Sequence, residues 1–260
     1  MELGLKGKVA IITGGSKGIG LATALLLADE GAEVAIVARE TESLRRSAEQ
    51  IKEQTGKEAL AISADVSRPE EAARAVAETV ARFGGVNILV NNAGTSAARP
   101  FEHVETDAWT ADLDLKLFGA VQFSRAVLPH MRQAGGGAIV NVTAVGGKTP
   151  GASSLPTSVS RAAGLALTKA MSKDLAADRI RVNAVCIGLI RSAQIERMWQ
   201  VSAPELSWDE FAADARHGIP LGRIGNAREA ANVIGFLVSE AASFVTGTSV
   251  NIDGGISAVL

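Results

Sequence analysis

Short runs of apolar residues alternate with longer segments of helical periodicity along most of the chain. The short runs are rich in Val, Ile and Ala and barely alternate with polar residues, a pattern typical of parallel strands buried on both faces. They predict strands at residues 9–13, 33–38, 59–64, 88–91, 138–142, 181–186 and 249–252. The segments between them predict helices near residues 19–29, 42–54, 69–82, 107–133, 157–177 and 227–239.

Two of these helices are preceded by residues that can cap a helix. Ser67, followed by Glu70, is a good helix start, because the serine oxygen and the glutamate carboxylate can reciprocally satisfy free backbone amides. Asn226, followed by Glu229, gives a weaker form of the same signal.

Alternation of strands and helices leaves two architectures, an open doubly wound sheet or a closed barrel of eight strands. Seven expected strands and a glycine-rich first turn favour the open sheet. We therefore expect an α/β fold, a Rossmann-type doubly wound parallel sheet of seven strands, in a single domain over residues 1–260. Residues 192–225 are poorly periodic, and a long segment of this kind is usually functional, so we expect a substrate lid there.

The turn after the first strand reads Thr13-Gly-Gly-Ser-Lys-Gly-Ile-Gly20. Its spaced glycines allow a tight turn and a close approach of the backbone to a pyrophosphate, and the following helix offers free N–H groups. A flexible turn is the alternative interpretation, but the flanking strand and helix favour a dinucleotide site.

The end of the second strand bears on the choice of cofactor. A carboxylate near this point favours NAD, whereas a cation accommodates the 2′-phosphate of NADP. Ala38 is uncharged, Arg39 follows it, and Lys17 lies in the glycine turn, so NADP is favoured and NAD remains the alternative. Glu40 is a complication, and both cations could be solvated surface residues.

Composition excludes several function classes. The chain is 47% hydrophobic and 21% charged, which is typical of soluble globular proteins. A net charge of −2 predicts no nucleic-acid partner and no anionic membrane surface. The single Cys186 excludes a disulfide framework, and with no His/carboxylate cluster we expect no metal. The first apolar run does not resemble a signal peptide and no run is long enough to span a membrane, so we expect a cytoplasmic protein.

The aromatic residues are seven Phe and three Trp, with no Tyr. Any mechanism that requires a phenol is therefore excluded.

Five motifs resemble those of one known family, in order and at the expected spacing. They are Thr13-Gly-Gly-Ser-Lys-Gly-Ile-Gly20, Asp65-Val66, Asn91-Asn-Ala-Gly94, Arg181-Val-Asn183 and Asp253-Gly-Gly255. Together they resemble the short-chain dehydrogenase/reductase family over essentially the full chain. The resemblance implies a Rossmann-type sheet, a homotetramer or homodimer, and hydride transfer between a nicotinamide cofactor and a small-molecule carbonyl or alcohol.

The resemblance also implies a set of cofactor-binding residues. Asp65 and Val66 would flank the adenine, and Asn91, Ala93 and Gly94 would line the floor of the site. The Asn91–Gly94 stretch is also expected to hold neighbouring strands together. In full, the expected cofactor-binding residues are Gly14, Ser16, Lys17, Gly18, Ile19, Gly20, Arg39, Asp65, Val66, Asn91, Ala93, Gly94, Arg161, Gly188, Ile190 and Ser192.

The active site of the family usually contains Tyr and Lys four residues apart, a Ser thirteen residues before that Tyr, and an Asn on the preceding long helix. Here the Tyr position holds Thr157 and the Lys position holds Arg161. The Ser position holds Ala144, with Thr143 beside it, and the Asn position holds Lys116. The resemblance therefore points to an atypical member in which all four residue types differ.

These residue types restrict the proton chemistry. Thr157 is too weak an acid to replace a phenol, and Arg161 stays protonated. Lys116 is the residue there that can titrate, and a second cation would lower its pKa. We therefore hypothesise that Lys116 is the proton donor or carbonyl polariser, beside Arg161, with Thr143, Ser153 and Thr157 as hydrogen-bonding orienters. The alternatives are a surface lysine with solvated charge and a Ser/Thr cluster that caps a helix.

Three functions remain open at this point. The first is an atypical NADP-dependent oxidoreductase acting on an unidentified carbonyl or alcohol through a non-tyrosine proton path. The second is a non-redox lyase or dehalogenase on the same fold, and the third is a catalytically silent NADP-binding protein. His103, His130 and His217 share no motif and are expected at the surface.

Overall fold

Seven parallel strands form one sheet in the order β3-β2-β1-β4-β5-β6-β7. The computed structural model describes residues 2–260. Its strands are β1 (Val9–Thr13), β2 (Glu33–Ala38), β3 (Leu60–Ser63), β4 (Ile88–Asn91), β5 (Gly137–Ala144), β6 (Ile180–Ile187) and β7 (Ser249–Ile252). The strand order reverses between β1 and β4, and ligands of such sheets bind beyond the carboxyl ends of the strands at this point. The expected single α/β domain of Rossmann type is confirmed.

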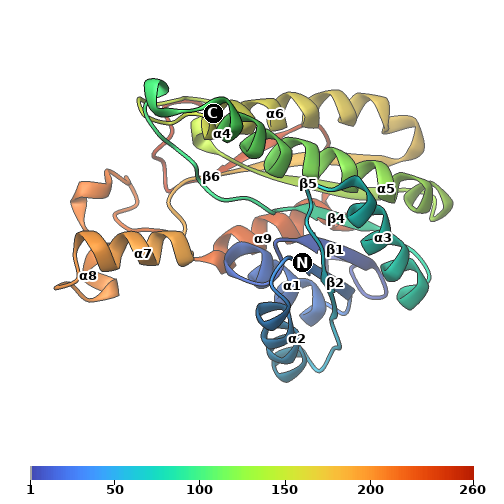
Figure 1. The fold of residues 1–260 in the computed structure, drawn as a ribbon. Helices are drawn as coiled ribbons and strands as arrows, with labels where there is room; N and C mark the ends of the chain where they lie inside the picture. Colours follow the sequence, from blue (N-terminus) through green and yellow to red (C-terminus); the bar gives the residue numbers. More distant parts are fainter. Residues whose placement is uncertain (1) are drawn as a thin grey trace.

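Helices cover both faces of the sheet (Figure 1). Ile11 and Ile12 of β1 enter different core clusters, because successive side chains of a strand point to opposite faces. The helices are α1 (Gly18–Asp29), α2 (Thr41–Thr55), α3 (Pro69–Phe83), α4 (Thr106–Leu113), α5 (Gly119–Gln133), α6 (Thr157–Asp174), α7 (Ala193–Ser202), α8 (Trp208–Ala212) and α9 (Ala227–Val238). One core cluster includes residues of α1 and α9, and the other includes residues of α3 and α5. None of the helices is both long and apolar enough to cross a membrane.

The helix expected at residues 107–133 is interrupted. A π-helical turn, Asp114–Phe118, separates α4 from α5. A π-turn adds a residue to the helical repeat and so rotates the side chains that follow it, and such turns are frequent at functional sites. Lys116 lies in this turn and is buried.

The two capping predictions have opposite outcomes. Asn226 caps α9 in a complete capping box with Glu229, so this weaker signal is confirmed. The prediction for Ser67 is wrong, because Arg68 is the N-cap residue of α3 and makes no side-chain capping bond. The Ser67 hydroxyl instead donates to Asp65 Oδ1 at 2.7 Å.

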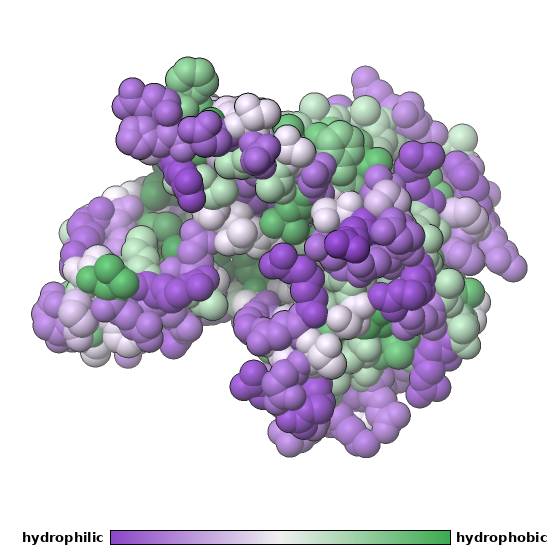
Figure 2. All heavy atoms as spheres, viewed as in Figure 1, coloured by the Kyte–Doolittle hydropathy of each residue, from purple (hydrophilic) through white to green (hydrophobic). Residues whose placement is uncertain are grey.

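Residues 192–225 are more regular than the sequence pattern indicates. They contain α7 and α8, which stand away from the sheet (Figure 1). Phe211, Ala203 and Ile224 form a small core of their own, with Trp199 and Trp208 packed against it. Figure 2 shows a recess between this segment and the rest of the molecule.

Candidate active site

The glycine turn after β1 is built for close backbone contact. Gly14 has a φ of +64° and Gly18 a φ of +54°, both in the left-handed region that favours glycine. A Cβ at Gly20 would collide with the Gly14 carbonyl oxygen. Asn92 Nδ2 donates to this oxygen at 3.1 Å and so ties the turn to the end of β4. The turn therefore holds a tight conformation that side chains would block.

A cavity of about 220 Å³ lies beyond the carboxyl ends of β1, β2 and β4. Many of the residues expected to bind a cofactor meet here: Gly14, Ser16, Arg39, Asp65, Val66, Ala93 and Gly94. Burial alone would raise the pKa of Asp65, but hydrogen bonds from Ser67 and the nearby Arg39 and Arg68 outweigh it and lower that pKa. The cavity thus presents an ionised carboxylate beside a cation.

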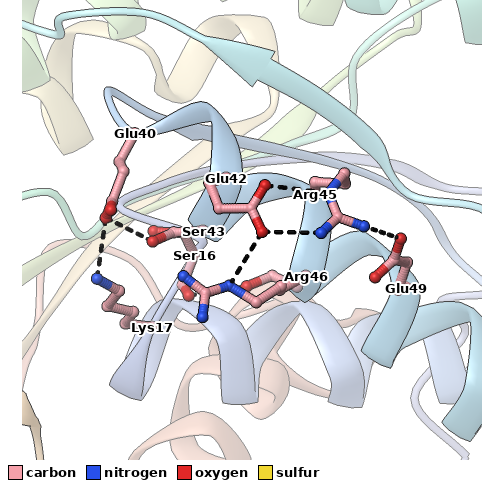
Figure 3. Close-up of polar contacts among 9 residues, drawn as sticks. Ser16, Lys17, Glu40, Glu42, Ser43, Arg45, Arg46 and Glu49 are labelled. Atoms are coloured by element: carbon pink, nitrogen blue, oxygen red, sulfur yellow. Dashed lines mark hydrogen bonds and ion pairs between the residues drawn. The ribbon is translucent and has the colours of Figure 1, made fainter.

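Lys17 is paired with Glu40 at the edge of this cavity (Figure 3). Lys17 Nζ lies 3.0 Å from Glu40 Oε2, and Ser43 Oγ donates to the same oxygen at 2.5 Å. The hydrogen bonds from Ser43 and Lys17 lower the pKa of Glu40. The sequence indicates two cations for a 2′-phosphate, Lys17 and Arg39. Lys17 is already paired with the Glu40 carboxylate, whereas Arg39 is among the residues that line the cavity.

Lys116 is buried inside the protein, and the interpretation as a solvated surface lysine is wrong. Its side chain is 1% exposed and is paired with Asp112, whose side chain is 2% exposed. Nζ also donates to Thr157 Oγ1 at 3.0 Å. The Lys116 ammonium group therefore links the π-helical turn before α5 to Thr157 at the start of α6. No motif in the sequence singles out Asp112; its i,i+4 spacing from Lys116 is the one sequence feature that relates the two residues.

Thr157 is partly exposed and its hydroxyl has a defined orientation. The hydroxyl oxygen accepts from Lys116 Nζ and from the Ala97 amide, the latter at 2.9 Å. A hydroxyl oxygen has two acceptor lone pairs, and these two donors occupy both. Its own proton is therefore left to donate to a third group. This makes Thr157 a hydrogen-bond donor backed by a buried cation.

Arg161 is a second cation beside Lys116. Its Nη1 donates to the Val142 carbonyl at 2.6 Å. Its Nη2 lies so close to Gly94 that a Cβ at that residue would be only 2.9 Å from Nη2. Its Nε is buried and has no hydrogen-bond partner within residues 2–260. Burial lowers the pKa of Arg161, opposed by the Asp112 charge, but a guanidinium remains protonated in proteins. The site therefore contains a fixed positive charge.

The protonation of Lys116 reflects opposing influences. Burial lowers its pKa most strongly, the hydrogen bond to Asp112 opposes this, and the charge of Arg161 lowers the pKa further. The net direction is downward from the ordinary value of 10.5. A lysine with a lowered pKa can exchange its proton closer to neutral pH than a solvated one.

Two of the expected orienters are not brought to Lys116. The Thr143 hydroxyl donates to the Val185 carbonyl at 3.0 Å and contacts Cys186 Sγ, although its side chain lines the cavity around Lys116. Ser153 is exposed, has a φ of +57°, and is not among the residues that line this cavity. Both therefore differ from the hypothesised arrangement.

Several expected cofactor residues have structural contacts as well. Asn91 Nδ2 donates to Asn141 Oδ1 at 2.9 Å, so this side chain links β4 to β5. Ser192 caps α7 by accepting from the Ile195 amide. Gly188 packs against Asp253, where a Cβ would collide. Ile190 is buried.

The histidines and acidic residues show no metal centre. Within residues 2–260, no group of three or more His, Cys, Asp or Glu side chains is placed to hold a metal ion. His217, expected at the surface, is half-buried. Its Nε2 contacts the Phe211 carbonyl, and its ring packs edge-on against the Phe211 ring.

Comparison with known proteins gives full-length matches. A family model described as enoyl-(acyl carrier protein) reductase matches residues 14–257. A 3-oxoacyl-(acyl-carrier-protein) reductase of Thermotoga maritima is 35% identical over 97% of this chain and 98% of its own length.

Solved structures agree with this relationship. L-Sorbose reductase of Gluconobacter frateurii, complexed with NADPH and L-sorbose, has a TM-score of 0.93 and 33% identity, covering 100% of both chains. A Pseudomonas aeruginosa short-chain oxidoreductase with an atypical catalytic center has a TM-score of 0.95 and 35% identity, covering 99% of this chain and 100% of that one. The NADPH-bound form of the Pseudomonas protein has a TM-score of 0.92 and 35% identity, covering 97% of this chain and 98% of that one. The sequence motifs, the sheet order and these matches agree that the chain belongs to the short-chain dehydrogenase/reductase family.

Proposed function

We propose that this protein is an NADP-dependent oxidoreductase that interconverts a small-molecule carbonyl and alcohol, with Thr157 and Lys116 as its proton path. The observation that carries the proposal is the hydrogen bond from the buried Lys116 ammonium to the hydroxyl of Thr157, a residue that is partly exposed. Together they form a proton donor in a site that has no tyrosine.

The residues present fit a dinucleotide. Gly14 and Gly20 leave a backbone surface that a Cβ would fill, which allows close approach of a pyrophosphate. Ala38 and Arg39 at the end of β2 leave room and a positive charge for a 2′-phosphate, which supports NADP over NAD. The Gluconobacter and Pseudomonas relatives were solved with NADPH. Bound NADPH supplies the hydride that the carbonyl carbon accepts.

The protein side of the reaction is a proton transfer in two linked hydrogen bonds. Thr157 Oγ1 gives its proton to the carbonyl oxygen, and Lys116 Nζ gives a proton to Thr157 Oγ1. The O–H bond of the product alcohol forms, one N–H bond breaks, and Lys116 is left as a neutral amine that takes up a proton before the next turnover. Because the Lys116 side chain is 1% exposed, it acts through Thr157 and not by touching the substrate.

Arg161 contributes charge without exchanging protons. Its guanidinium is fixed by the Val142 carbonyl and lies against Gly94. A fixed cation stabilises negative charge as it develops on an oxygen, and it does so more strongly where water is excluded. It also disfavours protonated Lys116, which makes that ammonium a better acid.

Residues 192–225 are proposed to cover the substrate. The Gln194 side-chain oxygen of α7 accepts from the Ser96 amide at 3.2 Å. This contact joins the lid segment to the loop after β4, close in sequence to Ala97, which holds Thr157. Movement of α7 would therefore act on the loop that orients the proton donor. As the family resemblance implies, we expect the enzyme to be a homotetramer or homodimer.

The proposal is tested with the purified protein, NADPH, and a panel of ketones, aldehydes and sugars. We expect loss of the reduced-nicotinamide absorbance with at least one carbonyl, and more slowly with NADH. Substrate loss without a change in this absorbance would indicate non-redox chemistry instead. Tight NADPH binding without turnover of any substrate would indicate a silent binding protein, and either result would overturn the proposal.

A further inference from the structure

We propose that Asp112 is the positioning residue of this site, holding the Lys116 ammonium against Thr157 while Ser160 fixes the carboxylate. The inference rests on the proposed proton path and adds two residues to it. Asp112 Oδ1 contacts Lys116 Nζ, and Oδ2 accepts from Ser160 Oγ at 2.6 Å. Each oxygen of the carboxylate therefore has its own donor.

The carboxylate connects the two helical segments that form the site. Asp112 lies at the end of α4, Lys116 in the π-helical turn, and Ser160 in the first turn of α6. Ser160 Oγ also lies 3.0 Å from the Thr157 carbonyl oxygen, within the same helical turn. The position of Asp112 relative to α6 thus determines how Lys116 meets Thr157.

The charges around Lys116 make this carboxylate necessary. Arg161 of α6 is the other cation that faces Lys116. The remaining polar groups that line the cavity are amides and hydroxyls from β1, β4, β5 and α6: Thr13, Asn91, Asn141, Thr143 and Ser160. Cys186 of β6 lies behind Thr143. Within residues 2–260, Asp112 is the carboxylate paired with Lys116, and it opposes the buried charge of Lys116 and the adjacent charge of the half-buried Arg161.

Asp112 also affects the pH range over which Lys116 is protonated and can donate a proton. Burial and Arg161 lower the pKa of Lys116, while Asp112 raises it. Without the carboxylate, the remaining influences all act downward, so Lys116 would lose its proton at lower pH. Lys116 would then be neutral, and unable to donate a proton to Thr157, over part of the pH range in which it is protonated in the intact site.

The test follows Lys116 directly in the cofactor-free protein. Lysines are labelled with ¹³C at Cε, and the Lys116 NMR signal is identified by its absence from Lys116→Met. We expect Asp112→Asn to lower the midpoint of the Lys116 titration by about one pH unit or more, and Ser160→Ala to lower it by less. Asp107→Asn, a matched change at an exposed position of α4, should leave it unchanged.

An unchanged Lys116 midpoint in Asp112→Asn would overturn the inference. If that variant does not fold, Ser160→Ala provides the test instead. An unchanged Lys116 midpoint in Ser160→Ala would show that the Asp112–Ser160 contact does not position the carboxylate for Lys116. Asp112→Glu should return the midpoint toward that of the wild type.

Activity separates this inference from the proposed function. If Lys116→Met reduces carbonyls at the wild-type rate, both fail together. If Lys116→Met is inactive but Asp112→Asn titrates as the wild type does, the proton path stands and the inference alone fails.

Discussion

The Lys116 ammonium and the Asp112 carboxylate form a buried ion pair, with side chains 1% and 2% exposed, between the end of α4 and the π-helical turn. Burying two charges is expensive, and such a pair is often no more stabilising than apolar residues of similar size. The pair is therefore better explained by what it does for Thr157 than by stability. It holds a cation behind a hydroxyl whose proton is free to donate.

Replacing Thr157 by Val removes the hydroxyl and retains the size and branching of the side chain. We expect carbonyl reduction to fall by about 10²–10⁴-fold, the usual contribution of a positioned proton donor. Thr157→Ser retains the hydroxyl and should stay within about tenfold of the wild type. Steady-state rates with NADPH and a reducible carbonyl measure this, and Thr110→Val, at an exposed position of α4, is the control. Equal rates for Thr157→Val and the wild type would remove Thr157 from the path.

The ion pair should show strong coupling in stability. Asp112→Asn leaves a buried lysine without its charge partner, and Lys116→Met leaves a buried carboxylate, so each should cost about 3–5 kcal/mol of unfolding free energy. The double variant Asp112→Asn/Lys116→Met should cost less than the sum of the two single changes, because neither member of the pair is then left without its partner. Denaturant unfolding of the three variants measures the coupling. Additive losses would mean that the two side chains do not interact.

The exposed pair Arg74–Glu78 of α3 is the control for this cycle. Its side chains are 47% and 44% exposed, so Glu78→Gln should change the free energy of unfolding by less than about 0.5 kcal/mol.

Glu40 should limit the preference for NADP. Replacing it by Gln frees Lys17 from its carboxylate partner and removes a negative charge from the edge of the cofactor cavity. NADPH should bind roughly two- to fivefold more tightly, an effect that salt weakens, while NADH binding stays the same. Fluorescence titration of both cofactors measures this, with Glu49→Gln on the outer face of α2 as the control. Equal gains for NADPH and NADH would show that Glu40 does not act on the 2′-phosphate.

The sequence was sufficient to predict the sheet and the glycine turn, whose residues Gly14 and Ser16 line the cavity beyond β1, β2 and β4. Both faces of the sheet are buried, as Ile11 and Ile36 show, so each strand is an uninterrupted apolar run that the sequence pattern identifies directly. The glycine turn is equally predictable from the sequence, because the positive φ of Gly14 and the close backbone contact at Gly20 both require glycine. Both signals are local in sequence.

The proposed proton path is only partly predictable from the sequence. The sequence predicts Lys116 and Thr157 in the site, but Asp112 looks like any other charged residue of a helix. Its burial depends on the π-helical turn and on Ser160 of α6, which are features of tertiary packing. Thr143 was expected to face Lys116, yet its hydroxyl turns to the neighbouring strand β6, whose carbonyl accepts from it.

The role of Lys116 as the source of the proton is tested by the pH dependence of carbonyl reduction in the wild type and in Lys116→Met. Reduction uses the protonated lysine, and its pKa is lowered from 10.5. The wild-type rate should therefore be high at low pH and fall as pH rises through a value below 10.5. Lys116→Met should be about 10²–10⁴-fold slower and lack this decline, whereas Lys173→Met, an exposed change on α6, should match the wild type. A Lys116→Met enzyme with the wild-type rate and the same decline would show that Lys116 does not supply the proton.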